Sequence, residues 1–281
     1  MSFILNILKA LLYGIVQGLT EWFALGAQAH LRLMASFMPL TLFPAAADNL
    51  IFSQMFRAAV CFGSVMAVLV MYLGRLNPFD GGISDKEKHS ILRLWINILI
   101  ASLPAFIVGL IVSRFAGDKL QAPAVTGIFM VLSGILLFFS QTLKKKKTVG
   151  SLKAVSVKHS AAAGLFNILS VFPGCDHLPG LLAGCTLSGF TRTAAVEFAV
   201  FASIPAMFFG SMRTIASLDL SLNAGAFVII LIGLTASFCT SAAVFRKLVP
   251  YVKTHDFRMF GLYRVVLGII VLAASLLGFA A

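Results

Sequence analysis

The sequence predicts an all-α membrane protein with six transmembrane helices and two re-entrant helical hairpins arranged as inverted repeats. Three observations lead to this fold class: an apolar composition, long uncharged runs, and basic residues placed between those runs. Of the 281 residues, 59% are hydrophobic and only 11% are charged. The mean hydropathy of +0.98 lies far above the range of soluble domains. We therefore expect residues 1–281 to form a single integral membrane domain.

Six apolar runs are long enough to cross a hydrocarbon core, which takes about 20 helical residues. They are residues 55–73, 94–113, 124–141, 194–214, 224–245 and 259–279. The basic residues gather in three connections: Arg75, Lys86, Lys88 and Arg93; Lys144 to Lys147 with Lys153 and Lys158; and Arg246, Lys247, Lys253 and Arg258. By the positive-inside rule these connections are predicted to be cytoplasmic. A net charge of +12 placed in this way argues against nucleic-acid binding, which needs a basic and aromatic polar surface.

Two further apolar segments, about 3–40 and 158–192, are interrupted by Gly, Pro or polar residues. If either segment crossed the membrane, the charge pattern of the connections would be violated. We therefore expect each segment to dip into the membrane and return, the first from outside and the second from the cytoplasm. Non-helical backbone at that depth requires surrounding protein or a water-filled cavity.

A weak internal repeat supports this layout. Residues 127–137 match residues 261–271 with two glycines in register, and the sequence around Gly14 matches that around Gly164. The predicted halves are about 1–141 and 158–281, joined by a basic cytoplasmic loop, 142–157. An odd number of spans separates the copies, so the halves have opposite orientation, an arrangement known from transporters.

The predicted hairpin breaks carry the ionisable residues that are most costly at membrane depth. Glu21 and His30 lie at the first break, and Asp176 and His177 lie at the second. Buried ionisable groups usually face a cavity or a partner, so a pocket is expected where the tips meet. Such a pocket could hold a divalent cation, orient a water molecule or exchange protons with a phosphate headgroup. Each residue also has a structural alternative. Glu21 could be a carboxylate paired with a helix N-terminus or an imidazole, and His30 and His177 could be core histidines. Asp176 could be the N-cap of a half-helix.

Other polar residues have local explanations. Arg192 and Glu197 are expected to form an ion pair, and Arg264, within the last span, needs an acceptor in the bundle or at the headgroups. The run Lys144 to Lys147 is expected to be a cytoplasmic stop signal. The cysteines Cys61, Cys175, Cys185 and Cys239 lack metal-ligand spacing and are expected to be buried thiols.

Two motifs stand at the predicted breaks: residues 17–30 are QGLTEWFALGAQAH, and residues 173–179 are PGCDHLP. They resemble the motifs EGLTEFLPVSSTGH and PGxSRSG of the undecaprenyl-diphosphate phosphatase family of bacitracin-resistance proteins. The resemblance covers almost the whole chain and implies the same six spans and two hairpins. It also implies a bacterial plasma (inner) membrane location and a polyprenyl diphosphate substrate.

Departures from the motifs fall on the reacting centre. Glu21 and His30 are kept, but the first Glu is Gln17, the hydroxyl-bearing run is Gly26 to Ala29, and the Ser and Arg of the second motif are Asp176 and His177. Loss of the hydroxyls removes candidate nucleophiles, and loss of the Arg removes a fork suited to a diphosphate. The family scaffold is therefore predicted to carry a rewritten or disabled site.

The ionisable pattern and the resemblance together assign the site. The predicted catalytic residues are Glu21, His30, Asp176 and His177; the predicted substrate contacts are Gln17, Gln28 and Gly174; and the predicted ligands of a divalent cation, Mg²⁺ or Ca²⁺, are Glu21 and Asp176. Three functions stay open: hydrolysis of undecaprenyl diphosphate, binding or translocation of a polyprenyl phosphate without hydrolysis, and a regulatory membrane subunit. A homodimer is one alternative for assembly.

Overall fold

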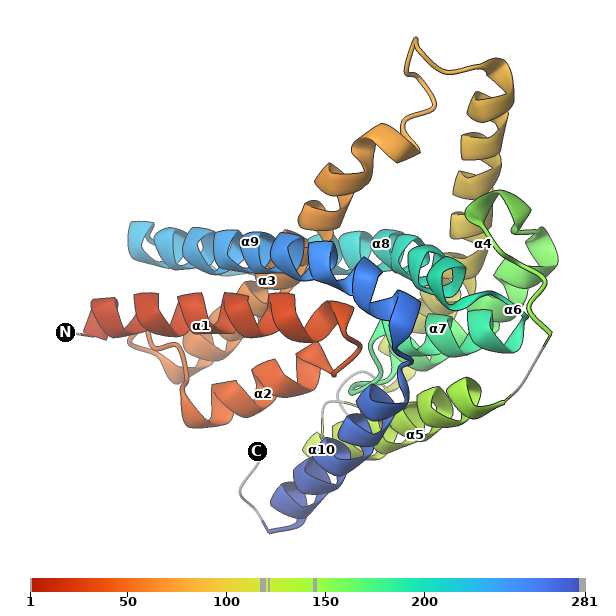
Figure 1. Cartoon of the computed structure of the whole chain (residues 1–281). Coiled ribbons are helices and arrows are strands. Elements are labelled where there is room, and N and C mark those ends of the chain that lie inside the picture. The colour runs from red at the N-terminus through yellow and green to blue at the C-terminus, as the bar shows by residue number, and fades with distance from the viewer. Residues whose placement is uncertain (1, 117–119, 121, 144–145, 278–281) are drawn as a thin grey trace.

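The chain folds into an all-α bundle, as the composition predicts (Figure 1). A computed structural model describes residues 2–116, 120, 122–143 and 146–277. Within these ranges the only β feature is an isolated bridge between Val149 and Phe190. Lys144, Lys145 and the last two residues of the predicted span 259–279 lie outside the described residues.

The described part of the chain contains seven helices that are long and apolar enough to cross a membrane, one more than predicted. Six of them correspond to the predicted runs, and the last of these runs extends past the end of its helix. Their bounds are α3 (Ala46–Leu76), α4 (Asp85–Ala116), α5 (Pro123–Thr142), α8 (Arg192–Ser217), α9 (Ala224–Thr254) and α10 (Arg258–Leu276). The seventh is α1 (Ser2–Trp22), the first arm of the first predicted hairpin. Gly14 and Gly18 lie within α1 and pack closely against α9. The helix ends at Trp22, so the turn falls between Glu21 and His30, where the first break was predicted.

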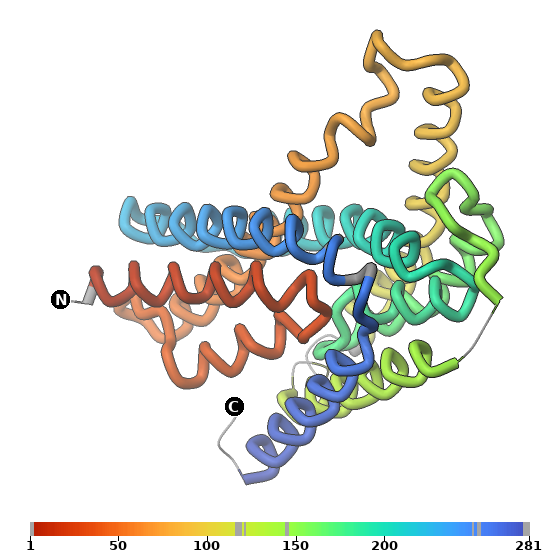
Figure 2. Tube along the Cα trace, in the orientation of Figure 1, coloured from red at the N-terminus to blue at the C-terminus, as the bar shows by residue number. Residues whose placement is uncertain are grey.

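Two hairpins interrupt the long helices, as the sequence predicts. The first joins α1 to α2 (Ala27–Phe37), and the second joins α6 (Val157–Asn167) through the short 3-10 helix η3 (Ile168–Val171) to α7 (His177–Leu187). The other 3-10 helix, η2, is Leu152–Ala154. Figures 1 and 2 show α2 doubling back beside α1 and the two hairpin turns facing each other near the centre of the bundle. The orientation of the bundle in the membrane stays a prediction.

Helices α5 and α10 pack together at backbone distance through the glycines that the internal repeat aligned. A Cβ atom at Gly134 would lie 2.7 Å from the carbonyl oxygen of Gly261, and one at Gly261 would lie 2.8 Å from that of Gly134. Gly127 and Gly268 form an equally close reciprocal contact, at 2.9 Å in both directions. Reciprocal pairing is the contact pattern that a two-fold relation between α5 and α10 produces. The division into halves 1–141 and 158–281 stays a prediction.

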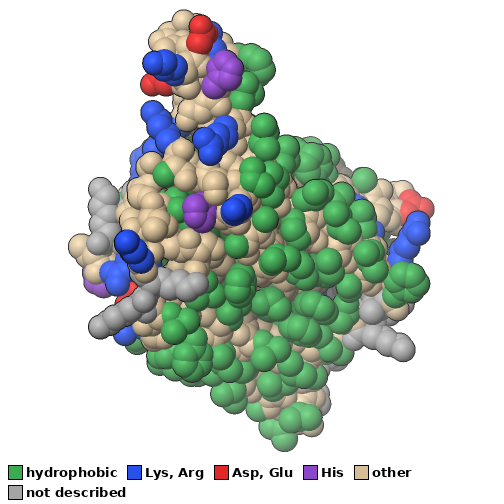
Figure 3. Space-filling model, turned by 90° about the vertical axis from the view of Figure 1, so that its right-hand side faces the viewer, with side chains coloured by type: hydrophobic (Ala, Val, Ile, Leu, Met, Phe, Trp, Pro, Cys, Tyr) green, Lys and Arg blue, Asp and Glu red, His purple; other side chains and the backbone are tan. Residues whose placement is uncertain are grey.

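The surface and the interior have the polarity expected of a membrane bundle. Hydrophobic side chains cover much of the face in Figure 3, while Lys and Arg lie mainly towards its upper end and its two margins. Inside, a chain of hydroxyls joins α3 to α9: the Ser64 and Ser237 oxygens lie 2.8 Å apart, and Ser241 donates to Ser64 at 2.9 Å. These bonds satisfy buried hydroxyls that would be costly in an apolar setting.

Two local predictions are wrong. Glu197 pairs with Arg75 at 3.4 Å, and Arg192 lies 3.9 Å from Asp256, so Arg192 and Glu197 do not pair with each other. Residues five apart on a helix point in different directions, unlike residues three or four apart. Cys61, Cys175 and Cys185 are buried free thiols as expected, whereas Cys239 is exposed.

Candidate active site

The two hairpin tips are held together by one fully buried side chain, Arg264 of α10. Its Nη1 donates to the Ala24 carbonyl at 3.0 Å and to the Asp176 carboxylate at 3.1 Å. Its Nη2 donates to the Gly174 carbonyl, and both Nε and Nη2 donate to the Ser133 hydroxyl. Arg264 thus finds its acceptors on both tips and on α5. The ion pair with Asp176 is almost completely shielded from solvent.

Local backbone conformation explains why the chain turns at these points. Gly26 and Gly174 adopt left-handed φ values of 97° and 88°, which L side chains rarely take. At Gly174 a Cβ atom would also collide with the carbonyl oxygen of Thr126. Ala24 is left-handed as well, with a φ of 57°. This turn directs the Ala24 carbonyl to Arg264.

A cavity of about 620 Å³ lies at the meeting point of the tips. Five of the predicted site residues line it: Glu21, Gln28, Gly174, Asp176 and His177. The sequence-based expectation that the two breaks form one polar pocket agrees with this geometry. The remaining two predicted residues, Gln17 and His30, are not among the residues that line it.

Glu21 reaches the cavity from the last turn of α1, although its side chain is only 3% exposed. Gln17, one helical turn earlier, donates from Nε2 to the Glu21 carboxylate at 2.9 Å. Gln17 is itself fully buried and lies behind Glu21 rather than on the cavity wall. Its position favours holding the carboxylate over contacting a substrate.

His30 is held away from the cavity by two partners. Its Nδ1 lies 2.7 Å from the Gly26 carbonyl, and its Nε2 lies 2.7 Å from the Tyr263 hydroxyl, with the two rings stacked. A carbonyl oxygen can only accept, so Nδ1 carries a proton and donates. Both nitrogens are therefore engaged, and His30 fastens α2 to α10.

His177 is oriented by Asn167 at the end of α6. Its Nδ1 lies 3.1 Å from the Asn167 side-chain oxygen, and the Asn167 amide nitrogen donates to the Ala101 carbonyl at 3.4 Å. With the amide oriented in this way, Nδ1 is the protonated nitrogen and Nε2 of a neutral ring keeps its lone pair. Among the described residues, Nε2 has no hydrogen-bond partner. His177 thus offers a proton-accepting atom at the cavity.

The predicted carboxylate ligands do not fit a protein-held divalent cation. Asp176 is already paired with Arg264, whose positive charge opposes a cation at that place. Glu21 accepts a hydrogen bond from Gln17. Within the described ranges, no group of three or more His, Cys, Asp or Glu side chains is arranged to hold a metal.

Sequence reasoning missed the cationic wall of the cavity. Arg32 of α2, Arg57 of α3 and Arg213 of α8 all line it. A signal for Arg57 was available, because this residue lies inside the predicted span 55–73. The site predicted from the sequence contained acids, histidines and amides, and Arg264 was the one intramembrane arginine considered. An arginine at membrane depth is costly in the same way as an acid, so it is also a candidate for a functional site.

The fold and the cavity together define a multi-pass α-helical membrane protein with a charged site between two hairpin tips. Residues 10–270 match the family described as bacitracin resistance protein BacA, and the chain belongs to that family.

Three relatives are similar over nearly their full length. The undecaprenyl-diphosphatase of Enterococcus faecalis is 31% identical, with 95% of this chain and 96% of the relative covered. The undecaprenyl-diphosphatase 1 of Clostridioides difficile strain 630 is 32% identical, with 96% of each chain covered. The undecaprenyl-diphosphatase of Streptococcus mutans is 33% identical, with 97% of each chain covered.

Proposed function

We propose that this protein hydrolyses a polyprenyl diphosphate, such as undecaprenyl diphosphate, to the polyprenyl phosphate and inorganic phosphate. The relatives' names give the substrate. The observation that carries the proposal is His177, whose Nδ1 is engaged by Asn167 at the wall of a cavity that also contains Glu21. This arrangement orients an imidazole as a general base, with the amide in the place of an orienting third group.

In the proposed step, a water molecule attacks the distal phosphorus of the diphosphate. Nε2 of His177 accepts a proton from that water as the new P–O bond forms. The P–O bond of the anhydride breaks, and its electron pair leaves with the polyprenyl phosphate. The carboxylate of Glu21 shares the cavity and is the second group able to take or return a proton. Gln17 positions that carboxylate through its hydrogen bond.

Phosphate release from undecaprenyl diphosphate by the purified protein tests this function. The assay is run with EDTA, with Mg²⁺ and with Ca²⁺, because a metal requirement would contradict the metal-free step. His177→Ala and Glu21→Gln are expected to lose most of the activity, while His89→Ala, a control at an exposed helix start, retains it. If no condition gives release although the lipid binds, the hydrolase proposal is wrong.

A second candidate is a protein that binds or translocates a polyprenyl phosphate without hydrolysis. Two observations favour it: the first tip has no hydroxyl between Gly26 and Ala29, and Asp176 is committed to Arg264. Lipid binding without phosphate release, together with transfer of labelled lipid between the leaflets of a proteoliposome, would establish this function. If the protein neither binds the lipid nor releases phosphate, a regulatory membrane subunit is the function that remains.

The proposed location is a bacterial plasma membrane with the basic loops in the cytoplasm. In that orientation the cavity opens outward, since its lining includes Ser113, Ser217 and Leu218, at helix ends opposite the basic loops. Labelling of single cysteines introduced at residues 150 and 221 from one side of intact cells tests the orientation. The homodimer stays a proposal, which light scattering of the purified protein tests.

A further inference from the structure

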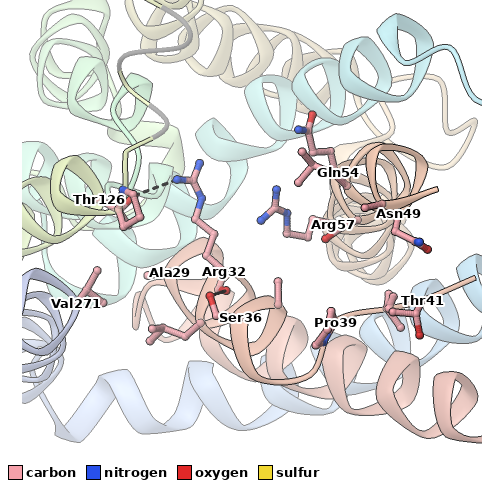
Figure 4. A pocket seen from close by; sticks show the side chains of 17 residues that line it. Ala29, Arg32, Ser36, Pro39, Thr41, Asn49, Gln54, Arg57, Thr126 and Val271 are labelled. Atoms are coloured by element: carbon pink, nitrogen blue, oxygen red, sulfur yellow. Dashed lines mark hydrogen bonds between the residues drawn. The ribbon is translucent and has the colours of Figure 1, made fainter. Parts of the chain in front are cut away.

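A second cavity, of about 590 Å³, adjoins the polar one. The two cavities share three lining residues: Arg32, Gln54 and Arg57. The second cavity is otherwise lined mainly by α2, the 39–41 loop and the first turns of α3, with several aliphatic side chains. Figure 4 shows the guanidinium groups of Arg32 and Arg57 extending into the same space from opposite walls. This pair therefore marks the boundary between a polar and a more apolar compartment.

Both arginines are presented by regular helical spacing. Arg32 follows Gln28 by one turn of α2, so both side chains lie on the face that lines the polar cavity. Arg57 lies on a face of α3 together with Gln54 and Cys61. Arg32 is held in place by donating to the Thr126 hydroxyl at 3.1 Å. The side chains of both arginines are partly buried.

The charge balance at this boundary favours an anion. Arg32 and Arg57 line the same two cavities, and the ion pairs of the described residues do not include Arg57. Two like charges in a partly desolvated site repel each other. Two described acids line the polar cavity with these arginines: Asp176 is paired with Arg264, and Glu21 accepts a hydrogen bond from Gln17. A ligand that carries two or more negative charges would relieve this repulsion.

We propose that Arg32 and Arg57 bind the diphosphate of the lipid substrate, at the boundary between the two cavities. This inference rests on the proposed function for the identity of the ligand. Guanidinium groups bind phosphate oxygens through paired N–H donors, and two of them match the two phosphates of one headgroup. The distal phosphate then faces Glu21 and His177 in the polar cavity, and the first prenyl units enter the second cavity. These arginines supply the forked cations that the second hairpin, with His177, lacks.

Binding of undecaprenyl diphosphate to the His177→Ala protein tests the proposal without turnover. Arg32→Gln and Arg57→Gln are each expected to weaken binding by roughly 10- to 100-fold, the range for loss of a hydrogen bond to a charged group. Arg32→Lys and Arg57→Lys should recover part of the loss, because a lysine keeps the charge without the fork. Arg93→Gln, at an exposed position on α4, is the matched control and should bind as the parent does.

Two further measurements keep the test decisive. Binding of undecaprenol, which has no phosphate, should be unchanged by the arginine substitutions. Without ligand, Arg57→Gln should unfold at the same or a higher temperature than the parent, because a repulsive charge is removed. Parent-like diphosphate affinity in both glutamine variants would overturn the inference even if hydrolysis is confirmed. Weaker diphosphate binding would support it even if no variant, nor the wild type, releases phosphate.

Discussion

Replacing Arg264 with Gln would remove the donor that joins the two hairpin tips. The change leaves the Asp176 carboxylate buried without its cation, and it leaves the carbonyls of Ala24 and Gly174 without this donor. Breaking a buried ion pair by removing one partner costs about 3–5 kcal/mol, because the remaining charge is uncompensated. We expect the apposition of the tips to weaken by at least the lower end of that range.

Thiol labelling measures this loss at the tip itself. Cys175 precedes Asp176, is buried, and donates to the Phe129 carbonyl at 3.0 Å. In a background with Cys61, Cys185 and Cys239 changed to Ser, Cys175 is the one remaining cysteine. Because it is only 4% exposed, we expect its labelling to require local opening of the tip. A free-energy loss of about 3 kcal/mol raises the open population, and hence the labelling rate, by roughly 100-fold.

A double variant separates the lost charge pair from a general packing defect. Asp176→Asn in the Arg264→Gln protein removes the unpaired charge, so labelling of Cys175 should slow towards the parent rate. Arg264→Lys should fall between Arg264→Gln and the parent, because one ammonium cannot reach every acceptor of the guanidinium. If Arg264→Gln labels within about threefold of the parent, a difference of less than ~1 kcal/mol, the cross-linking role of Arg264 is refuted.

Three other substitutions test the tips and the site. Gly174→Ala should destabilise the protein by about 1–3 kcal/mol in thermal unfolding, because a side chain strains the left-handed backbone and its Cβ meets the Thr126 carbonyl. The control Gly150→Ala should leave the unfolding temperature unchanged, because Gly150 has open space around it. His30→Gln should lower the unfolding temperature but leave phosphate release within a few fold, since both ring nitrogens are engaged outside the cavity; a complete loss of release in a folded protein would return His30 to the catalytic set. Asn167→Ala should reduce kcat with little change in lipid affinity, because the preferred tautomer of His177 is lost; an unchanged kcat would remove the basis for that orientation.

The sequence was sufficient for the architecture because apolar length and backbone breaks are local properties. Five of the six predicted runs lie within helices, the sixth is helical up to Leu276, and both hairpin turns occur at the predicted breaks. The seventh candidate span, α1, was not predicted because a crossing by the first segment, about 3–40, would violate the charge pattern of the connections. The close packing of Gly14 and Gly18 against α9 depends on tertiary contacts, which the sequence does not specify.

The site was predicted in part, for a similar reason. The convergence of Glu21 with Asp176 and His177 follows from the placement of the breaks. The turning of His30 towards Tyr263 depends on side-chain direction, which the sequence does not specify. The pairing of Asp176 with Arg264 joins residues 88 positions apart, and no local pattern indicates that partner.

The Arg264 network also limits how the protein could expose its cavity to the two sides of the membrane. Because one guanidinium binds both tips and Ser133 of α5, moving one tip alone would break several buried hydrogen bonds at once. The tips, α5 and α10 are therefore expected to move as one rigid body. Any alternation of access would then come from movement of the surrounding helices, among them α3 and α8, which pack against each other and line the cavity.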